Sequence, residues 1–289
     1  WSLPLLDPAD TQHYLATVRE AVRRRLEHDR AIDYFVALSA FHEELHCEAF
    51  TYTRQTLGYQ APAGTAQPLF GEAWPGDVAI DGGVFSLGAN DDGRFVFDNE
   101  KWAHPVEVRP FCMARAPVTN GQFAEFVEAG GYATQKWWSN DGWNWRMDQG
   151  LTLPLYWQKK GSGWQRRLFD RLESLPEHEP VIHVSWYEAD AWCRWAGRRL
   201  PTEAEWELAA RGGLDGAEFA WGDELTPGGK HMANTWQGAF PHENTRADGF
   251  ARTSPVKAYP ANGYGLYDMI GNVWEWTRDF WTARGDKPE

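Results

Sequence analysis

The sequence has few cysteines and no long apolar run. Its three cysteines are widely spaced, and no two of them form a C-x-x-C pair: Cys47, Cys112 and Cys193. This usage argues against a disulfide framework, so we expect a reducing, cytoplasmic location. No stretch has the length and apolarity of a transmembrane helix or a signal peptide, so we expect a soluble protein without membrane contact.

Positive charge is also scarce. The 28 Lys and Arg residues are outnumbered by 41 Asp and Glu residues, which gives a net charge of −13. No basic patch is interleaved with aromatic residues, so nucleic acid is not an expected partner. The 289 residues are enough for two domains. The chain begins at Trp1 without a methionine, and we therefore expect a further segment upstream.

Tryptophan, by contrast, is abundant. The chain has 18 Trp residues, and most of them follow Trp74. Such a composition, together with many glycines, is typical of an irregular domain held by large aromatic cores. We expect the indole N–H groups to donate hydrogen bonds to backbone carbonyls.

Two histidines define the candidate metal site. The apolar periodicity of residues 33–57 predicts a helix, on which His42 and His46 lie one turn apart on the same face. Two neutral imidazoles in that arrangement can bind one metal ion. Glu43 and Glu48 lie off this stripe. The alternative is that two polar positions of a helix happen to be histidines, which an otherwise apolar face makes costly.

Two metal chemistries fit these residues. The pattern H-E-x-x-H occurs in zinc peptidases, where Glu43 would be the general base. The same residues fit a three-histidine iron site whose third ligand comes from another helix of a bundle. His13 and His28 lie on the preceding predicted helix, but a lone histidine is usually a surface residue. The choice between zinc and iron stays open at this point.

The N-terminal part is predicted to be helical. Asp7 and Pro8 are typical of a helix start, and Gly58 is typical of the end of the second helix. Two amphipathic helices cannot enclose a core, so we infer that an upstream segment completes a bundle. Residues 1–59 are therefore assigned to a helical bundle, and the Pro-, Ala- and Gly-rich residues 60–76 to a linker.

After the linker the periodicity changes to that of short strands and short helices. Residues 78–80 and 84–88 are expected to form a hairpin around Asp81, Gly82 and Gly83. The tryptophan-rich region from 137 to 164 has no clear periodicity and is expected to be loop-rich. Further helices are predicted to begin at Ser185 and, behind a capping box, at Thr202.

Four motifs of this C-terminal part resemble those of the formylglycine-generating enzyme, a modified C-type-lectin-like domain. They are Phe97–Glu100 (FDNE), Pro117–Asn120 (PVTN), Arg199–Glu207 (RLPTEAEWE) and Gly271–Trp276 (GNVWEW). A DinB-like helical bundle followed by such a domain resembles the ergothioneine-type sulfoxide synthases. The helix after the second histidine is most similar to the selenoneine-synthase branch of that family. The resemblance implies an α+β chain, with the lectin-like domain at residues 77–289.

The resemblance implies an oxidoreductase that contains non-haem Fe(II) and uses O₂. His42 and His46 match the second and third iron ligands of this family, and the first would lie upstream of Trp1. The implied substrates are small molecules. They are O₂, a thiol or selenol donor, and hercynine, whose imidazole C2 becomes bonded to sulfur or selenium. The metal is expected at the interface of the two domains, and the catalytic residues are expected beyond Glu289.

A calcium site is implied by the resemblance to the formylglycine-generating enzyme. The residues that match its structural Ca²⁺ ligands are Asn234, Thr235, Asp248 and Phe250, with Asn272 at a second site. Oxygen ligands of these kinds suit calcium. A loop of Asx turns without metal is the alternative.

The sequence departs from the ergothioneine-type pattern at one position, and three other functions are compatible with parts of it. Many ergothioneine-type enzymes have Gln, which helps to hold the substrate, where this chain has Leu45. An oxidase that acts on a protein cysteine, as the formylglycine-generating enzyme does, is the first alternative. A zinc peptidase would need a cleft beside the helix and a third ligand downstream. A lectin-like binding module would leave the histidine face packed by core side chains.

Overall fold

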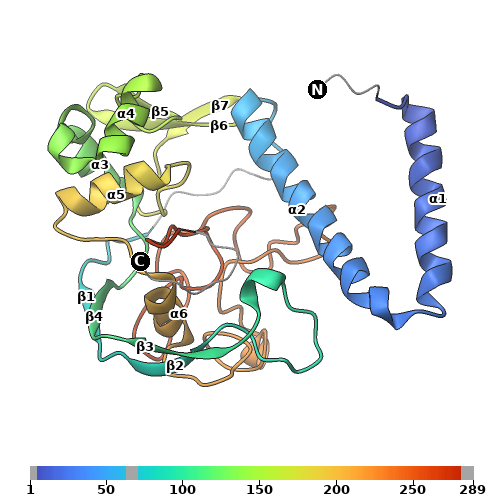
Figure 1. The fold of residues 1–289 in the computed structure, drawn as a ribbon. Coiled ribbons are helices and arrows are strands. Elements are labelled where there is room, and N and C mark those ends of the chain that lie inside the picture. The colour runs from blue at the N-terminus through green and yellow to red at the C-terminus, as the bar shows by residue number, and fades with distance from the viewer. Residues whose placement is uncertain (1–4, 63–70, 281–289) are drawn as a thin grey trace.

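The computed structural model describes residues 5–62 and 71–280. Two long helices at the N-terminus are followed by a domain of short helices, short strands and extensive loops (Figure 1). The helices are α1 (Pro8–Leu26), α2 (Asp33–Leu57), α3 (Asn120–Glu128), α4 (Asn140–Asp148), α5 (Trp186–Trp195) and α6 (Glu203–Arg211). The strands are β1 (Asp77–Ile80), β2 (Gly83–Leu87), β3 (His104–Val108), β4 (Phe111–Ala114), β5 (Trp157–Lys160), β6 (Gly163–Leu168) and β7 (Arg171–Ser174).

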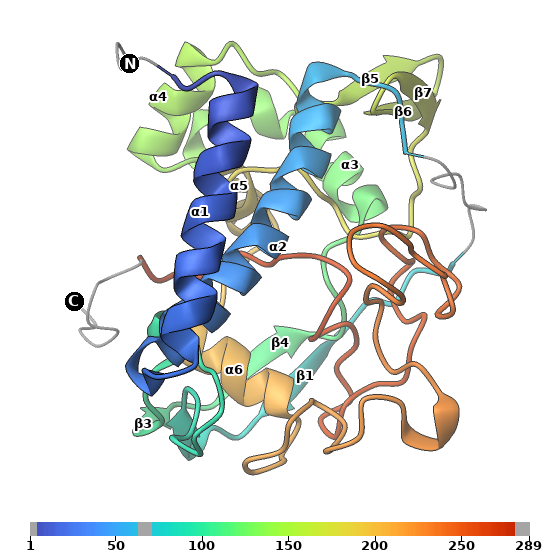
Figure 2. The same ribbon diagram turned by 90° about the vertical axis from the view of Figure 1, so that its right-hand side faces the viewer.

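The N-terminal helices begin and end where the sequence predicts. The side chain of Asp7 caps α1 by accepting a hydrogen bond from the Asp10 N–H, and Pro8 occupies the first turn. Helix α2 ends at Gly58, whose φ of 65° lies in the left-handed region that favours glycine. None of the residues of α1 is buried. Figure 1 shows α1 on the far side of α2 from the domain, and Figure 2, seen from that side, shows α1 in front of α2. The completed bundle therefore stays a prediction.

The predicted hairpin is wrong. Strands β1 and β2 exist, but β1 pairs with β4 and β2 pairs with β3, each pair antiparallel. The intervening glycines turn the chain from one two-stranded sheet into the other. A Cβ at Gly82 would lie 2.3 Å from the carbonyl oxygen of Val108, so only glycine fits beside the end of β3.

The tryptophan-rich region is more regular than its sequence indicates. It contains helix α4 and strand β5, and β5 pairs with the following strands β6 and β7 in an antiparallel sheet; the sequence predicts neither the helix nor the sheet. Phe123, Phe126 and Ala191 bring α3 and α5 together in an aromatic core with Trp138 and Trp157. The expected indole hydrogen bonds are confirmed in part, since several indoles donate to carbonyls and others to carboxylates.

A second core forms around α6. Leu208, Ala209 and Leu266 pack with Ile80 and Val108 of the two small sheets. The capping box predicted at Thr202 is present. The Thr202 side chain accepts the Glu205 N–H, and the Glu205 carboxylate accepts the Thr202 N–H. After α6 the described chain contains no α-helix or strand up to residue 280. Across the described residues, no helix is long and apolar enough to cross a membrane.

Helix α2 is joined to the domain by a buried amide. The Gln55 side chain is 1% exposed, and its Nε2 donates to the Arg167 carbonyl at 2.9 Å. Its Oε1 accepts from the Phe169 N–H at 2.6 Å. Arg167 Nη1 in turn donates to the Gln55 carbonyl at 2.7 Å. Figure 1 shows this end of α2 beside β6 and β7.

This joint predicts the effect of removing the amide. Gln55→Leu keeps most of the side-chain volume but leaves the Phe169 N–H and the Arg167 carbonyl buried without partners, which costs about 1–3 kcal/mol. We expect that loss in the free energy of unfolding, measured by urea denaturation. Gln60→Leu, at an exposed position, is the matched control and should change stability by less than about 0.5 kcal/mol. Equal stability of the two variants would contradict this account of the joint.

Candidate functional site

The two predicted metal ligands point toward each other. The Nε2 atoms of His42 and His46 are 3.0 Å apart, and their ring centroids are separated by 4.6 Å at an interplanar angle of 87°. Two imidazole nitrogens that bind one ion at about 2.1 Å and at a right angle lie about 3 Å apart. The pair therefore fits two adjacent positions around a metal ion.

Among the residues that the structure describes, no third protein ligand lies beside this pair. Within residues 5–62 and 71–280, no group of three or more His, Cys, Asp or Glu side chains has metal-binding geometry. His42 and His46 are themselves exposed. The structure thus provides two nitrogen ligands on one face of α2, and the face is not packed by core side chains.

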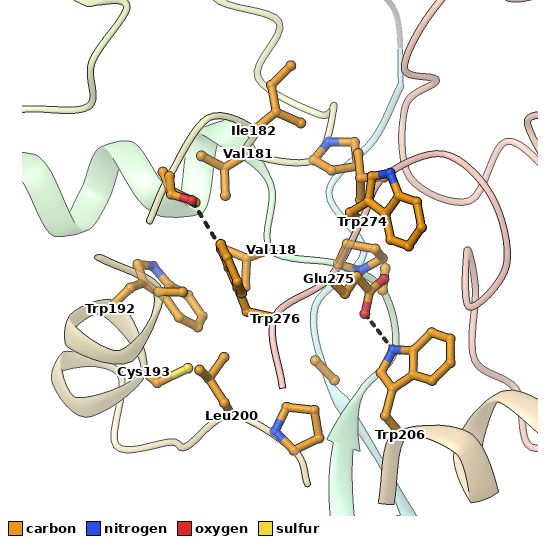
Figure 3. A pocket seen from close by; sticks show the side chains of 18 of the residues that line it. Val118, Val181, Ile182, Trp192, Cys193, Leu200, Trp206, Trp274, Glu275 and Trp276 are labelled. Carbon is orange, nitrogen blue, oxygen red and sulfur yellow. Dashed lines mark hydrogen bonds between the residues drawn. The ribbon is translucent and has the colours of Figure 1, made fainter. Parts of the chain in front are cut away.

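A large cavity lies between α2 and the domain. Its volume is about 1330 Å³, and α2 contributes Glu48, Thr51, Tyr52 and Thr56 to its lining. Its apolar wall carries, among others, Val118, Val181, Ile182, Trp192 and Leu200, as Figure 3 shows. Neither histidine of the pair lines this cavity. At 100° per residue they lie about 120° and 160° around the helix from Glu48. The metal was expected at the interface of the two domains, but α2 directs His42 and His46 away from the cavity at that interface.

The GNVWEW segment forms one side of the cavity. The indole of Trp274 donates to Glu48 of α2 at 3.1 Å, a second contact between the helix and the domain. The indole of Trp206 donates to Glu275 at 2.9 Å, which Figure 3 also shows. Burial is the main cause that raises the pKa of Glu275 to about 7, and the nearby carboxylate of Asp268 raises it further. Burial likewise raises the pKa of Asp268.

The far end of the cavity is cationic, a feature that the sequence analysis missed. Arg252 and His183 line it, and they come from loops about 70 residues apart in the chain. Tyr156 meets the His183 ring edge-on at 5.0 Å. Their sequence neighbours carry no motif that would have singled them out. Folding alone brings them together.

The five residues of the predicted calcium site do come together. The two carboxylate oxygens of Asp248 accept the N–H groups of Thr235 and Phe250 at 3.2 and 3.0 Å. Asn234 donates to the side-chain oxygen of Asn272 at 3.2 Å. That oxygen also accepts the Ser254 N–H at 2.8 Å, so both of its lone pairs are used within the protein. The donor set fits Ca²⁺ at Asp248 and Asn234, whereas Asn272 is arranged to hold the loops in place.

Similarity to known proteins covers most of the chain. Residues 64–288 match the family model of the sulfatase-modifying factor enzyme 1-like domain. The formylglycine-generating enzyme of Thermomonospora curvata is 45% identical over 222 residues, which covers 72% of each chain. The structure of PvdO from Pseudomonas aeruginosa superposes with a TM-score of 0.50 and 25% identity over 72% of this chain and 71% of that one.

A second group of relatives also covers the N-terminal helices. The hercynine oxygenase of Mycolicibacterium thermoresistibile is 38% identical over 293 residues, which covers 95% of this chain and 60% of that protein. The hercynine oxygenase of Mycolicibacterium smegmatis is 37% identical and covers 96% of this chain and 63% of its own length. This chain thus spans about three-fifths of these two relatives. It belongs to the family of proteins with a sulfatase-modifying factor enzyme 1-like domain.

Proposed function

We propose that the chain is part of an Fe(II)- and O₂-dependent enzyme that bonds sulfur or selenium to the imidazole C2 of hercynine. The observation that supports this most is the extent of similarity to the hercynine oxygenases. It covers 95–96% of the chain and so includes α2 with its histidine pair, whereas the family model begins at residue 64. The 3.0 Å separation of the two Nε2 atoms suits a shared metal ion.

In this proposal His42 and His46 hold iron, which would supply the activation of O₂ and of a bound thiolate or selenolate. The protein's part is to keep the two imidazoles in one orientation. The contacts of Gln55 and Glu48 with the domain hold α2 at two points, which fixes its rotation. The third ligand would come from a bundle helix outside residues 5–62, in the DinB-like arrangement. A cytoplasmic location suits a thiol or selenol co-substrate.

The proposed iron site predicts the effect of removing either histidine. His42→Ala or His46→Ala removes one of two neighbouring nitrogen ligands, so we expect loss of bound Fe(II) while the circular dichroism spectrum stays unchanged. Anaerobic titration with Fe(II), followed by metal analysis of the desalted protein, measures the loss. His28→Ala, on an imidazole that is 82% exposed, is the matched control and should bind as the unmodified chain does. Full iron occupancy in either test variant would refute the assignment.

The reaction itself is tested by product analysis. The anaerobic Fe(II) protein is mixed with hercynine and a panel of thiol and selenol donors, then exposed to O₂, and the products are followed by mass spectrometry. We expect a hercynine adduct that carries sulfur or selenium, and the donor that gives it decides between the ergothioneine and selenoneine branches. Hercynine recovered unchanged with every donor, from protein that holds iron, would count against the proposal.

The competing function is that of a formylglycine-generating oxidase acting on a protein cysteine. It is favoured by the 45% identity over the lectin-like part and by a cavity large enough for a peptide. Oxidation of a cysteine-containing peptide that does not depend on His42 would support it. A zinc peptidase finds no support, because the cavity is not beside Glu43. A lectin-like binding module predicted a packed histidine face, whereas the pair is exposed.

We further propose that Asp248, Asn234, Thr235 and Phe250 bind a structural Ca²⁺. We expect Ca²⁺ to stabilise the chain by about 2.7 kcal/mol at a hundredfold excess over its Kd, and a chelator to reverse this. Asp248→Asn should abolish the calcium-dependent rise in melting temperature, and the exposed Asp215→Asn should keep it. A rise that persists in Asp248→Asn would contradict the site.

A further inference from the structure

Three arginines and two carboxylates form a cluster at one end of the cavity, and Arg252 of this cluster lines the cavity itself. Arg166 takes both carboxylates, since its guanidinium pairs with Glu173 at 2.8 Å and with Glu179 at 3.0 Å. Glu179 is 2% exposed and also accepts the hydroxyl of Thr253 at 2.9 Å. Both carboxylates of this cluster are therefore paired directly with Arg166.

The second arginine is satisfied by backbone carbonyls. Arg167 Nη1 donates to the carbonyls of Gln55 and Phe169 at 2.7 and 2.8 Å. Its guanidinium also lies 4.5 Å from the centroid of the Tyr156 ring. The hydrogen bonds of Arg167 thus join the end of α2 to the Phe169 segment.

Arg252 is the third cation of this cluster, and it makes no direct ion pair with the two carboxylates. Its guanidinium lies 4.9 Å from the centroid of the Phe169 ring and forms no hydrogen bond or ion pair with any residue in the described ranges. Burial is the main cause that lowers the pKa of Arg252 and the charge of Arg166 adds to it, whereas the charges of Glu179 and Glu173 act in the opposite direction. A half-buried cation without a directly paired anion is costly, and stacking on one ring offsets part of that cost. This group therefore favours an anionic ligand from the cavity side.

His183 supplies a second polar group at the same place. Its backbone φ of 62° is unusual for a residue other than glycine. The imidazole is exposed and lines the cavity. Burial by the surrounding protein, with Arg252 and two further arginines, lowers the pKa of His183 to about 4. The imidazole is neutral at pH 7 and has one N–H to donate.

From these contacts we propose that Arg252 and His183 form a binding site for a carboxylate. The planar guanidinium matches the two oxygens of a carboxylate, and the neutral imidazole adds one donor. The adjoining wall, with Ile182 and Val184, suits the apolar body of the same ligand. Two sources have this chemistry: a free amino-acid carboxylate, and the acidic side chain of a peptide.

This site is separate from the histidine pair. Gln55 contacts the same Phe169 segment on which Arg252 is stacked, and it lies nine residues after His46. Nine residues correspond to about 14 Å along α2 and to half a turn around it. A hercynine molecule cannot reach both places. The inference therefore does not rest on the proposed function.

Binding of two matched pairs of probes tests the inference. The first pair is N-acetylglutamate α-amide and N-acetylglutamine amide, and the second is hercynine and its decarboxylated analogue. We expect at least one carboxylate to bind about tenfold more tightly than the partner that lacks the carboxylate, and to shift the Arg252 Nε–H resonance in NMR titrations. The pair that shows the difference identifies the source of the carboxylate.

Variants separate this site from a general charge effect. Arg252→Met should remove the preference for the carboxylate, and Arg252→Lys should keep part of it because the charge remains without the planar fork. Arg171→Met, whose side chain is 61% exposed outside the cavity, should bind as the unmodified chain does. Melting temperatures confirm that each variant is folded. Equal binding of the probes with and without the carboxylate, or an unchanged preference in Arg252→Met, would overturn the proposal.

Discussion

The attachment of α2 by Gln55 decides which way the histidine pair faces. The amide is buried between the Arg167 carbonyl and the Phe169 N–H, so the rotation of the helix about its axis is fixed at that point. His46 precedes Gln55 by nine residues, which is half a turn at 100° per residue. A helix whose amide points into the domain must therefore present His46 on the opposite side. The contact of Glu48 with Trp274 holds the same rotation one turn after the pair.

The domain beneath α2 is built from loops that side chains hold in place. Its strands form two pairs and one three-stranded sheet, and the last 69 residues of the described chain after α6 contain no α-helix or strand. Side chains satisfy the backbone of these loops: Asn262 accepts the N–H groups of Tyr264 and Leu266, and Asn272 donates to the Ser254 carbonyl. Large aromatic cores supply the burial that longer elements would otherwise provide. Such a scaffold can place polar groups around a cavity independently of any regular element.

Overall charge and local charge differ in this molecule. The chain carries a net charge of −13, yet a cluster of three arginines and two carboxylates lies at one end of its cavity, and Arg252 of this cluster lines the cavity. The long-range field of the acidic surface is screened by salt within about 8–10 Å, whereas a half-buried guanidinium acts over its immediate contacts. An acidic composition is therefore compatible with a pocket that favours anions. The net charge alone would have argued against an anionic ligand, whereas Arg252 favours a carboxylate.

The sequence by itself determined the local features of this protein. Caps and stop residues predicted α1, α2, α5 and α6, because hydrogen bonds within a few residues decide those ends. The spacing of His42 and His46 likewise sufficed to place two nitrogens side by side. The resemblance of four motifs indicated the family, which the match over residues 64–288 confirms.

Tertiary structure decided whatever depends on distant partners. The strand pairs β1 with β4 and β2 with β3 replaced the expected hairpin, because register is set by which sheet each strand reaches and not by the turn alone. Helix α4 and the β5–β7 sheet lacked a clear period because their aromatic residues pack on several sides. The meeting of Arg252 with His183, and the direction of the histidine pair, follow from packing between segments far apart in the chain, which short-range patterns do not encode.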